Sequence, residues 1–284
     1  MVMFSVLVPV FNEEKMVAST ISEIKAVMNK QNKKYEIIVI DDGSRDKSLS
    51  IMKRIKGLNV IVNQYNLGYG ASLKKGLSAA KGEWIIISDA DGTYPIKSIP
   101  DLLKDVPEYD MVVGSRVGGK CGVPFFRRPA KWFLNNLTSY IVGRKIPDLN
   151  SGLRVFRRDM AMRYFNLYPS GFSLTSTITM AALSHDYAVK YVPINYFKRV
   201  GKSSINPVHF VNFLILVMRL STLFNPLKVF IPFSIVLFVA GIAYGIYQFM
   251  LISNIGDLPV MLVLAAVQVG IFGFIADAIA KQRK

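Results

Sequence analysis

Cysteine, histidine and acidic residues are scarce in this sequence, and each shortage excludes a class of protein. The single cysteine, Cys121, excludes an intramolecular disulfide and fits a reducing compartment. The two histidines, His185 and His209, lack paired carboxylates and metal-ligand spacing, so we expect structural roles for both. The 35 basic residues outnumber the 19 acidic ones and give a net charge of +16. This charge favours an anionic partner: nucleic acid, an acidic membrane surface or a phosphorylated substrate.

Standard nucleic-acid and nucleotide motifs are also missing. The sequence has no zinc-finger cysteine pattern, RNP-type aromatic motif or basic zipper, so we expect no nucleic-acid partner. The loop "NLGYG" places Gly68, Gly70 and Gly76 at a spacing that does not match G-x-G-x-x-G, and it follows the third predicted strand rather than the first. No G-x-x-x-x-G-K-[ST] is present either. A dehydrogenase or a nucleoside triphosphatase is therefore not expected.

Charge is absent from two long apolar segments in the last quarter of the sequence. Residues 229–252 and 258–276 carry no charged side chain, and each approaches the roughly 20 residues that cross a bilayer. Because the linker "SNIGD" is short, we predict an antiparallel hairpin of two transmembrane helices, 229–252 and 258–278, within a region 228–280. The first helix contains Gly241 and Gly245 in a G-x-x-x-G pattern, which serves either the hairpin or a homo-oligomer.

Basic residues flank this hairpin on one side of the membrane. The linker carries Asp257 and no basic residue, so the positive-inside rule predicts that both ends and the N-terminal domain are cytoplasmic. The flanking basic residues are Arg219, Lys228, Lys281, Arg283 and Lys284. The start "MVMFSVLVPV" lacks a basic n-region and a cleavage site, so no signal peptide is expected.

The first 205 residues alternate short apolar runs with helical patterns. Such alternation predicts an open, mostly parallel α/β sheet covered on both faces, in a domain spanning 1–205. Strands are predicted at 4–10, 35–41, 59–63, 83–89 and 109–116, with helices from 13 to about 30, from near Ser44, and through 70–82.

Polar residues gather where each predicted strand ends. The segments "PVFNEE", "DDGS", "NLGYG", "DAD" and "GSR" follow the five strands in turn. Because ligands of open α/β sheets bind outside the carboxyl ends of the strands, we expect these segments to converge on one site.

Asp89 and Asp91 are two residues apart, so an extended strand end would project both to the same side. Taken alone, the pair fits either a solvated turn or a cation site. Two close carboxylates repel each other, and a hard ion such as Mg²⁺ or Mn²⁺ that also binds substrate phosphates removes this penalty. The convergence of five polar strand ends favours the cation site.

Two amphipathic segments are expected to lie at the membrane surface. Residues 122–145 mix bulky apolar residues with cations and predict an interfacial helix, although a basic helix packed on the sheet fits the same pattern. Residues 206–227 predict a second, juxtamembrane helix that leads into the hairpin.

The motifs "VPVFNEE", "VIDDGSRDKS", "NLGYGASLKKGLSAAKGEWIIISDADGTYP", "VGSR" and "SGLRVFRRD" together resemble glycosyltransferase family 2. With the hairpin, the chain is similar to the polyprenyl-phosphate glycosyltransferases, which include dolichyl-phosphate mannose synthase and undecaprenyl-phosphate sugar transferases. The resemblance implies a GT-A (Rossmann-like) fold that binds a nucleotide sugar at the sheet edge. It also implies a polyprenyl phosphate as acceptor.

The resemblance implies a role for each matching residue on the donor side. Thr93 stands where mannose synthases often have glutamine, which weakens a mannose-specific assignment. The residues implied in binding the nucleotide sugar are Pro9, Phe11, Glu13, Ile40, Asp42, Asp89, Ala90, Asp91, Thr93, Arg199 and Lys202, with Asp89 and Asp91 as metal ligands.

On the acceptor side the resemblance implies phosphate binding by Arg116, Arg128, Lys131, Ser151 and Arg154. Asp148 is implied as an orienting residue or base, so the catalytic candidates are Asp89, Asp91, Arg116 and Asp148. Two structural alternatives are open: Arg154 bridges loops, and Asp148 caps or orients a neighbouring arginine.

The resemblance implies a single displacement with inversion, in which an anionic phosphate oxygen attacks the anomeric carbon. Three other functions are weighed against it: a processive polysaccharide synthase, transfer to a diacylglycerol-type lipid, and a non-catalytic sugar-nucleotide sensor or scaffold. The Q-x-x-R-W motif of processive synthases is absent.

Overall fold

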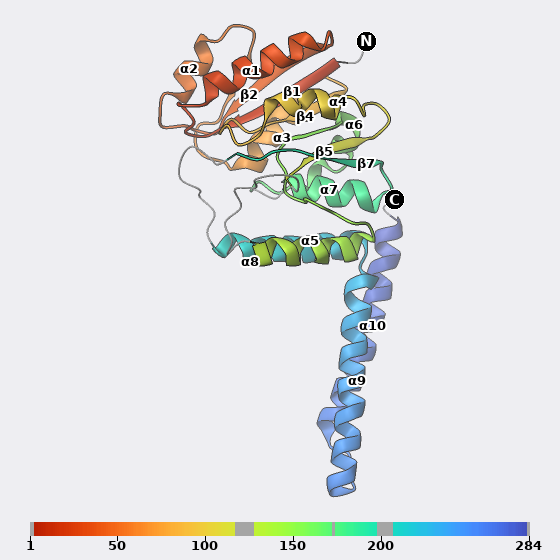
Figure 1. Cartoon of the computed structure of the whole chain (residues 1–284). Coiled ribbons are helices and arrows are strands. Elements are labelled where there is room, and N and C mark those ends of the chain that lie inside the picture. The colour runs from red at the N-terminus through yellow and green to blue at the C-terminus, as the bar shows by residue number, and fades with distance from the viewer. Residues whose placement is uncertain (1–2, 117–127, 172–173, 198–206, 283–284) are drawn as a thin grey trace. The chain divides into compact units, whose positions relative to one another are not determined.

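The computed structural model describes residues 3–116, 128–171, 174–197 and 207–282 (Figure 1). The chain divides into two compact units. The first comprises Met1–Asn135 and Ile146–Pro207, and the second comprises Asn136–Lys145 and Val208–Lys284. The sheet belongs to the first unit, and the long apolar helices belong to the second.

A seven-stranded sheet in the order β3-β2-β1-β4-β6-β5-β7 forms the first unit. Its strands are β1 (Met3–Val10), β2 (Lys34–Asp41), β3 (Asn59–Val62), β4 (Trp84–Ile87), β5 (Met111–Ser115), β6 (Arg154–Arg157) and β7 (Val189–Pro193). β6 is antiparallel to both its neighbours, and the other pairings among the described strands are parallel. The prediction of a mostly parallel α/β sheet is confirmed, and β6 and β7 add two strands that were not predicted.

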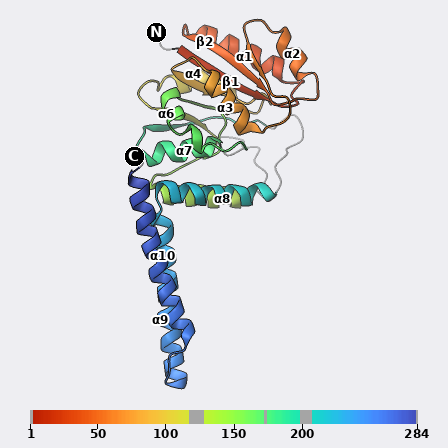
Figure 2. The ribbon, with the colours of Figure 1, turned by 180° about the vertical axis from the view of Figure 1, so that it is seen from behind.

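Helices cover both faces of this sheet (Figures 1 and 2). Alternate side chains of β1, from Phe4 to Val10, pack in one core with α1 (Val17–Lys30), α2 (Ser48–Arg54) and α4 (Ile99–Leu103). On the other face α3 (Tyr69–Ala79) approaches closely: a Cβ atom at Gly76 would lie 2.8 Å from Ile40 Cδ1. The remaining elements of this unit are η1 (Ile96–Ser98), α6 (Arg158–Arg163), η3 (Phe165–Leu167) and α7 (Leu174–Ser184).

The first two helices begin later than predicted. The patterns placed their starts at residue 13 and near Ser44, whereas α1 begins at Val17 and α2 at Ser48. The residues that precede the two helices form hydrogen bonds between their loops instead: the Asn12 amide donates to Ser44 Oγ, and the Arg45 amide donates to Asn12 Oδ1. These bonds hold the backbone in loops at the carboxyl ends of β1 and β2.

The second unit contains α8 (Pro207–Phe224), α9 (Leu227–Ile252) and α10 (Asp257–Gln282), together with the end of α5 (Arg128–Val142). α9 and α10 form the predicted hairpin, and both are long and apolar enough to cross a membrane. At 1.5 Å per residue, 26 residues span about 39 Å, which exceeds the hydrocarbon core. Between them, the Gly256 amide donates to Gln248 Oε1 at 2.9 Å and closes the turn.

The G-x-x-x-G pattern lies inside the hairpin. A Cβ atom at Gly241 would lie 2.9 Å from Val263 Cγ2, and one at Gly245 would lie 3.4 Å from Pro259 Cβ. Both glycines are buried, so they let α9 and α10 approach closely. This packing supports the intramolecular alternative for the motif, and the homo-oligomer stays a prediction.

Candidate active site

The loops after β1 and β2 bring the first predicted donor residues together. Besides the bonds of Asn12, the Glu13 amide donates to Ser48 Oγ at 2.9 Å, so the two loops are tied along their length. Phe11 is 41 % exposed at this edge, where its ring is accessible to a planar base. Pro9 and Ile40 are buried within their strands, and Ile40 lies under α3.

Asp42 holds the loop that leads into α3. Its carboxylate accepts hydrogen bonds from the amides of Leu67 and Gly68, both at 2.9 Å, and from Asn63 Nδ2 at 2.8 Å. Asp42 is buried, so these donors satisfy a group that would otherwise be costly to bury. A contact of Asp42 with a base has to be made alongside these three bonds.

Asp89 and Asp91 lie in the loop after β4, which ends at Ile87, rather than in the extended strand end that was predicted. Asp89 Oδ1 accepts from the Tyr69 hydroxyl at 2.9 Å. Asp91 Oδ1 accepts from the hydroxyl and the amide of Thr93, at 2.6 and 3.1 Å. Burial, reinforced by the negative charge of Asp89, raises the pKa of Tyr69 well above its ordinary value, so the phenol keeps its proton and donates.

The two other predicted residues of this loop are buried. Ala90 is part of the core, and its carbonyl accepts from Thr20 Oγ1 at 3.3 Å. Thr93 is buried as well, and its carbonyl accepts from the Phe197 amide at 2.9 Å. Ala90 and Thr93 therefore anchor the loop to the protein interior, while Asp89 and Asp91 remain half-buried at its surface.

The chemistry of this loop fits a hard divalent cation. Two half-buried carboxylates offer the oxygen donors that Mg²⁺ and Mn²⁺ prefer. No group of three His, Cys, Asp or Glu side chains with metal-ligand geometry occurs in the described part of the chain. An ion held by Asp89 and Asp91 would complete its coordination with water and substrate phosphates, which is the usual arrangement for Mg²⁺.

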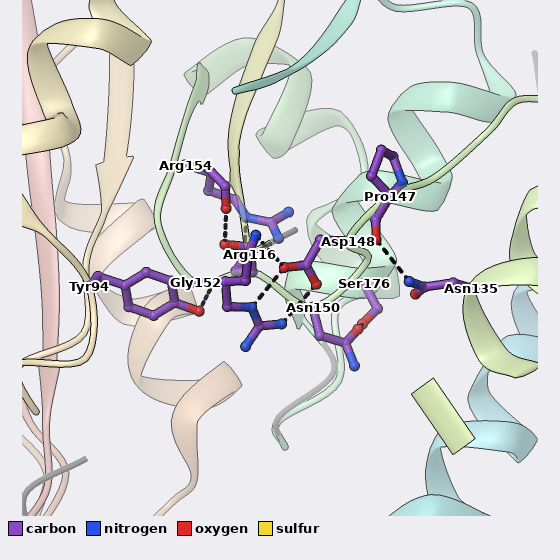
Figure 3. A network of polar contacts seen from close by, with 11 residues as sticks. Tyr94, Arg116, Asn135, Pro147, Asp148, Asn150, Gly152, Arg154 and Ser176 are labelled. Atoms are coloured by element: carbon purple, nitrogen blue, oxygen red, sulfur yellow. Dashed lines mark hydrogen bonds and ion pairs between the residues drawn. The ribbon is translucent and has the colours of Figure 1, made fainter. Parts of the chain in front are cut away.

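Arg116 is fixed by a bidentate ion pair with Asp148 (Figure 3). Its Nε donates to Asp148 Oδ2 at 2.7 Å and its Nη2 to Oδ1 at 2.8 Å, while its backbone amide also donates to Oδ2. Burial alone would lower the pKa of Arg116, but Tyr94 and the bond to Asp148 outweigh it and raise this pKa. Arg116 is therefore a permanent cation whose plane is set by the protein.

An aromatic contact connects Arg116 to the Asp89–Asp91 loop. The guanidinium carbon of Arg116 lies 5.2 Å from the centre of the Tyr196 ring. Tyr196 in turn contacts Tyr94 edge-on, with ring centres 5.3 Å apart, and Tyr94 directly follows Thr93 in the loop. These ring contacts thus connect the cation to the loop that carries the carboxylate pair.

Ser151 and Arg154 are both buried in the protein. The Ser151 hydroxyl donates to the Gly114 carbonyl at the end of β5. Arg154 has no exposed surface, and it donates to the carbonyls of Ser151 and Thr175 and to Thr179 Oγ1. This placement supports the loop-bridging alternative for Arg154. In the same way, the ion pair of Asp148 supports the alternative in which Asp148 orients an arginine.

The side chains of four predicted phosphate ligands lie outside the described part of the chain. Arg128 and Lys131 lie on α5, but their side chains are outside the described part of the chain, and Arg199 and Lys202 lie in the undescribed segment 198–206. Conversely, Tyr69, Tyr94, Tyr196 and Gly152 were not among the predicted site residues. Tyr69 stands between the glycines of "NLGYG", and only the tertiary structure shows that its hydroxyl bonds to Asp89.

Comparison with known families agrees with this geometry. The family model described as "Glycosyl transferase family 2" matches residues 5–165, more than half of the chain. The chain belongs to glycosyl transferase family 2. A second model, "GtrB C-terminal hairpin", matches residues 225–281, which include α9 and nearly all of α10. The family resemblance and the GT-A fold expected from the motifs are thereby confirmed.

Individual relatives differ in how much of this family 2 chain they cover. The dodecaprenyl-phosphate galacturonate synthase of Rhizobium johnstonii is 27% identical over 301 residues, covering 98% of this chain and 87% of that protein. The dolichyl-phosphate hexose transferase of Haloferax volcanii is 25% identical over 205 residues, covering 72% of this chain and 86% of that protein. Among solved structures, glucosyl-3-phosphoglycerate synthase of Mycobacterium tuberculosis, bound to Mn²⁺, UDP and phosphoglyceric acid, superimposes with a TM-score of 0.61 at 16% identity, covering 78% of each chain.

Proposed function

We propose that this glycosyltransferase moves a hexose from a nucleotide sugar to a membrane polyprenyl phosphate, with inversion, at the cytoplasmic face. The observation that carries the proposal is the set of ring contacts that connects the loop of a half-buried carboxylate pair to the fixed cation Arg116, in a chain that also has two helices long and apolar enough to cross a membrane. The names of two relatives, which specify polyprenyl-phosphate products or acceptors, support it.

On the donor side, the residues after β1 and β2 would hold the base and ribose. Phe11 offers a ring for stacking, Glu13 follows two residues later in the same loop, and Asp42 keeps the neighbouring loop in place. Pro9 and Ile40 shape the floor of this subsite from their strands. Asp89 and Asp91 would hold the divalent ion, with Arg199 and Lys202 as further diphosphate contacts. A bound Mg²⁺ or Mn²⁺ would act as a Lewis acid toward the leaving diphosphate. The solved relative with Mn²⁺ and UDP supports this choice of cofactor.

On the acceptor side, Arg116 would contact the lipid phosphate and Arg128 and Lys131 would assist from α5. Ser151, Arg154 and Asp148 would act through the loops that carry Arg116, because their polar groups are engaged inside the protein. An oxygen of the lipid phosphate attacks the anomeric carbon, and the bond from that carbon to the nucleotide diphosphate breaks. Since the attacking oxygen is already anionic, the reaction needs charge neutralisation and alignment rather than a strong base.

The membrane topology is part of the proposal. Domain 1–205 and both ends of the chain would lie in the cytoplasm, followed by the juxtamembrane helix 206–227 and the two spans in 228–280. The aromatic residues of α5 support an interfacial helix within 122–145: Trp132 is 70 % exposed, Phe133 47 % and Tyr140 54 %. Tryptophan and tyrosine are enriched at the headgroup level of membranes, where the acceptor phosphate also lies.

The test is sugar transfer by the purified full-length protein in detergent with Mn²⁺ or Mg²⁺. UDP-glucose, UDP-N-acetylglucosamine and GDP-mannose are each supplied with a short polyprenyl phosphate and, separately, with diacylglycerol. We expect a lipid-linked sugar from one donor, on polyprenyl phosphate alone, and its loss with EDTA. A product on diacylglycerol would contradict the acceptor assignment. Binding of a nucleotide sugar without turnover on either lipid would instead favour a sensor or scaffold.

A further inference from the structure

Tyr69 is the first residue of α3, and the backbone around it is held from two directions. The Gly70 amide donates to the Gly171 carbonyl at 3.1 Å, and the Ala71 amide donates to the Ser170 carbonyl at 2.9 Å. On the other side, Asp42 accepts from the Gly68 amide. The start of α3 is therefore fixed by bonds to two separate segments of the chain.

The glycines around Tyr69 make this anchoring possible. Gly68 has a φ of +96°, and a Cβ atom there would lie 2.8 Å from the Ser170 carbonyl oxygen. A Cβ atom at Gly70 would lie 2.5 Å from the Gly171 carbonyl oxygen. Because Gly68 and Gly70 have no side chains, the segment 169–171 packs closely against the backbone on both sides of Tyr69. This packing limits the movement of Tyr69.

The phenol of Tyr69 donates a hydrogen bond to one oxygen of Asp89, and the other oxygen is confined as well. The Tyr69 hydroxyl lies 2.9 Å from Asp89 Oδ1. Asp89 Oδ2 lies against Gly152, where an added Cβ atom would be only 2.7 Å away. The Asp89 carboxylate is thereby restrained at both oxygens, by a hydrogen bond on one side and by close backbone packing on the other.

We propose that Tyr69 is a positioning residue that orients the Asp89 carboxylate for its divalent ion and links the metal site to the Asp42 loop. The inference rests on the metal site in the proposed function and adds a residue that the family motifs do not assign. Carboxylate ligands are commonly held by hydrogen bonds from neighbouring groups, and loss of such a neighbour typically weakens metal affinity about 10–100-fold. Because Tyr69 does not need to touch the substrate, its loss should act on metal affinity rather than on the maximal rate.

The test compares Mn²⁺ binding by the wild type, Tyr69→Phe and the matched control Tyr65→Phe, in the full-length protein in detergent. Tyr65 lies in the same loop but its side chain is 65 % exposed. Unbound Mn²⁺ is measured by its electron paramagnetic resonance signal, with Mn²⁺ alone and with UDP or GDP added. We expect Tyr69→Phe to weaken Mn²⁺ binding about 10–100-fold and Tyr65→Phe to leave it unchanged. In transfer assays, saturating Mn²⁺ should restore the rate of Tyr69→Phe.

Each contrary result has its own meaning. If the wild type binds Mn²⁺ and Tyr69→Phe binds it equally well, the positioning role is wrong while the proposed function stands. If Tyr69→Phe lowers the thermal unfolding midpoint and loses rate that Mn²⁺ cannot restore, the phenol is structural and the inference is also overturned. If the wild type itself binds no Mn²⁺ with either nucleotide, the metal assignment fails and the role of Tyr69 fails with it.

Discussion

Asp91 and Asp148 are both acidic residues near the carboxyl ends of the parallel strands, yet their surroundings differ. Asp91 is half-buried and accepts hydrogen bonds from Thr93 in its own loop. Asp148 has no exposed surface and forms a bidentate pair with Arg116, 32 residues away in the sequence. A charge that the protein has fully enclosed must be neutralised by the protein itself. A half-buried carboxylate such as Asp91 can instead bind a ligand.

The same contrast separates the two loops as wholes. In the loop 88–94 the two acids, Asp89 and Asp91, remain half-buried. In the segment 146–154 both charged residues, Asp148 and Arg154, are buried, and Arg154 donates to two carbonyls and a hydroxyl. We therefore propose that the first loop binds ligand and that the second holds Arg116 and the sheet end in place.

The largest expected effect is on stability, from Asp148→Ala. This change leaves the guanidinium of Arg116, whose side chain is only 14 % exposed, without its carboxylate partner, which costs about 3–5 kcal/mol. The thermal unfolding midpoint in detergent should fall by about 10 °C. As a matched control, Asp101→Ala breaks an exposed pair with Lys104 and should leave the midpoint essentially unchanged. Equal midpoints for the two variants would contradict the structural role of Asp148.

A smaller effect is expected where the two loops touch, at Gly152. An alanine there places its methyl group 2.7 Å from Asp89 Oδ2 and 3.0 Å from the Tyr94 ring, so these groups must move. We expect a loss of about 1–3 kcal/mol in stability and, because Asp89 is displaced, a fall of up to about 10²-fold in transfer rate. Gly171→Ala is the control, since a Cβ atom there meets nothing within 4 Å. A wild-type rate for Gly152→Ala would argue against a requirement for the observed position of Asp89.

The smallest effect is expected from Thr93→Val, which removes the hydroxyl bond to Asp91 and keeps the backbone bond. A single hydrogen bond to a charged group is worth about 1.5–3 kcal/mol. Because the amide bond to Asp91 remains, we expect a loss of roughly the lower value, which raises the activating concentration of Mn²⁺ about tenfold. Thr20→Val removes a comparable hydroxyl that donates to the Ala90 carbonyl and should not change this concentration. Identical metal requirements for the two variants would show that Thr93 does not tune Asp91.

The sequence pattern predicted the position of the loop 88–94 better than that of the segment 146–154. Parallel strands place their carboxyl ends at one edge, so the position of the acids after the fourth strand could be predicted from local pattern alone. The pairing of Asp148 with Arg116 joins distant segments and leaves no local trace. The same holds for β6, a short strand with arginine at both ends that pairs between β4 and β5. Its Arg154 matched a phosphate-binding motif, and only the tertiary structure shows it buried.

The most direct test of the account is the rate of sugar transfer by Asp91→Asn relative to the wild type, at matched amounts of folded protein. Asparagine keeps the size of the side chain and one oxygen but removes the charge. The account predicts a fall of about 10²–10³-fold, the size of losing one preorganised electrostatic contact, with the unfolding midpoint unchanged. A rate close to that of the wild type, or a loss of rate that only follows a loss of folded protein, would contradict the assignment of this loop to the ligand.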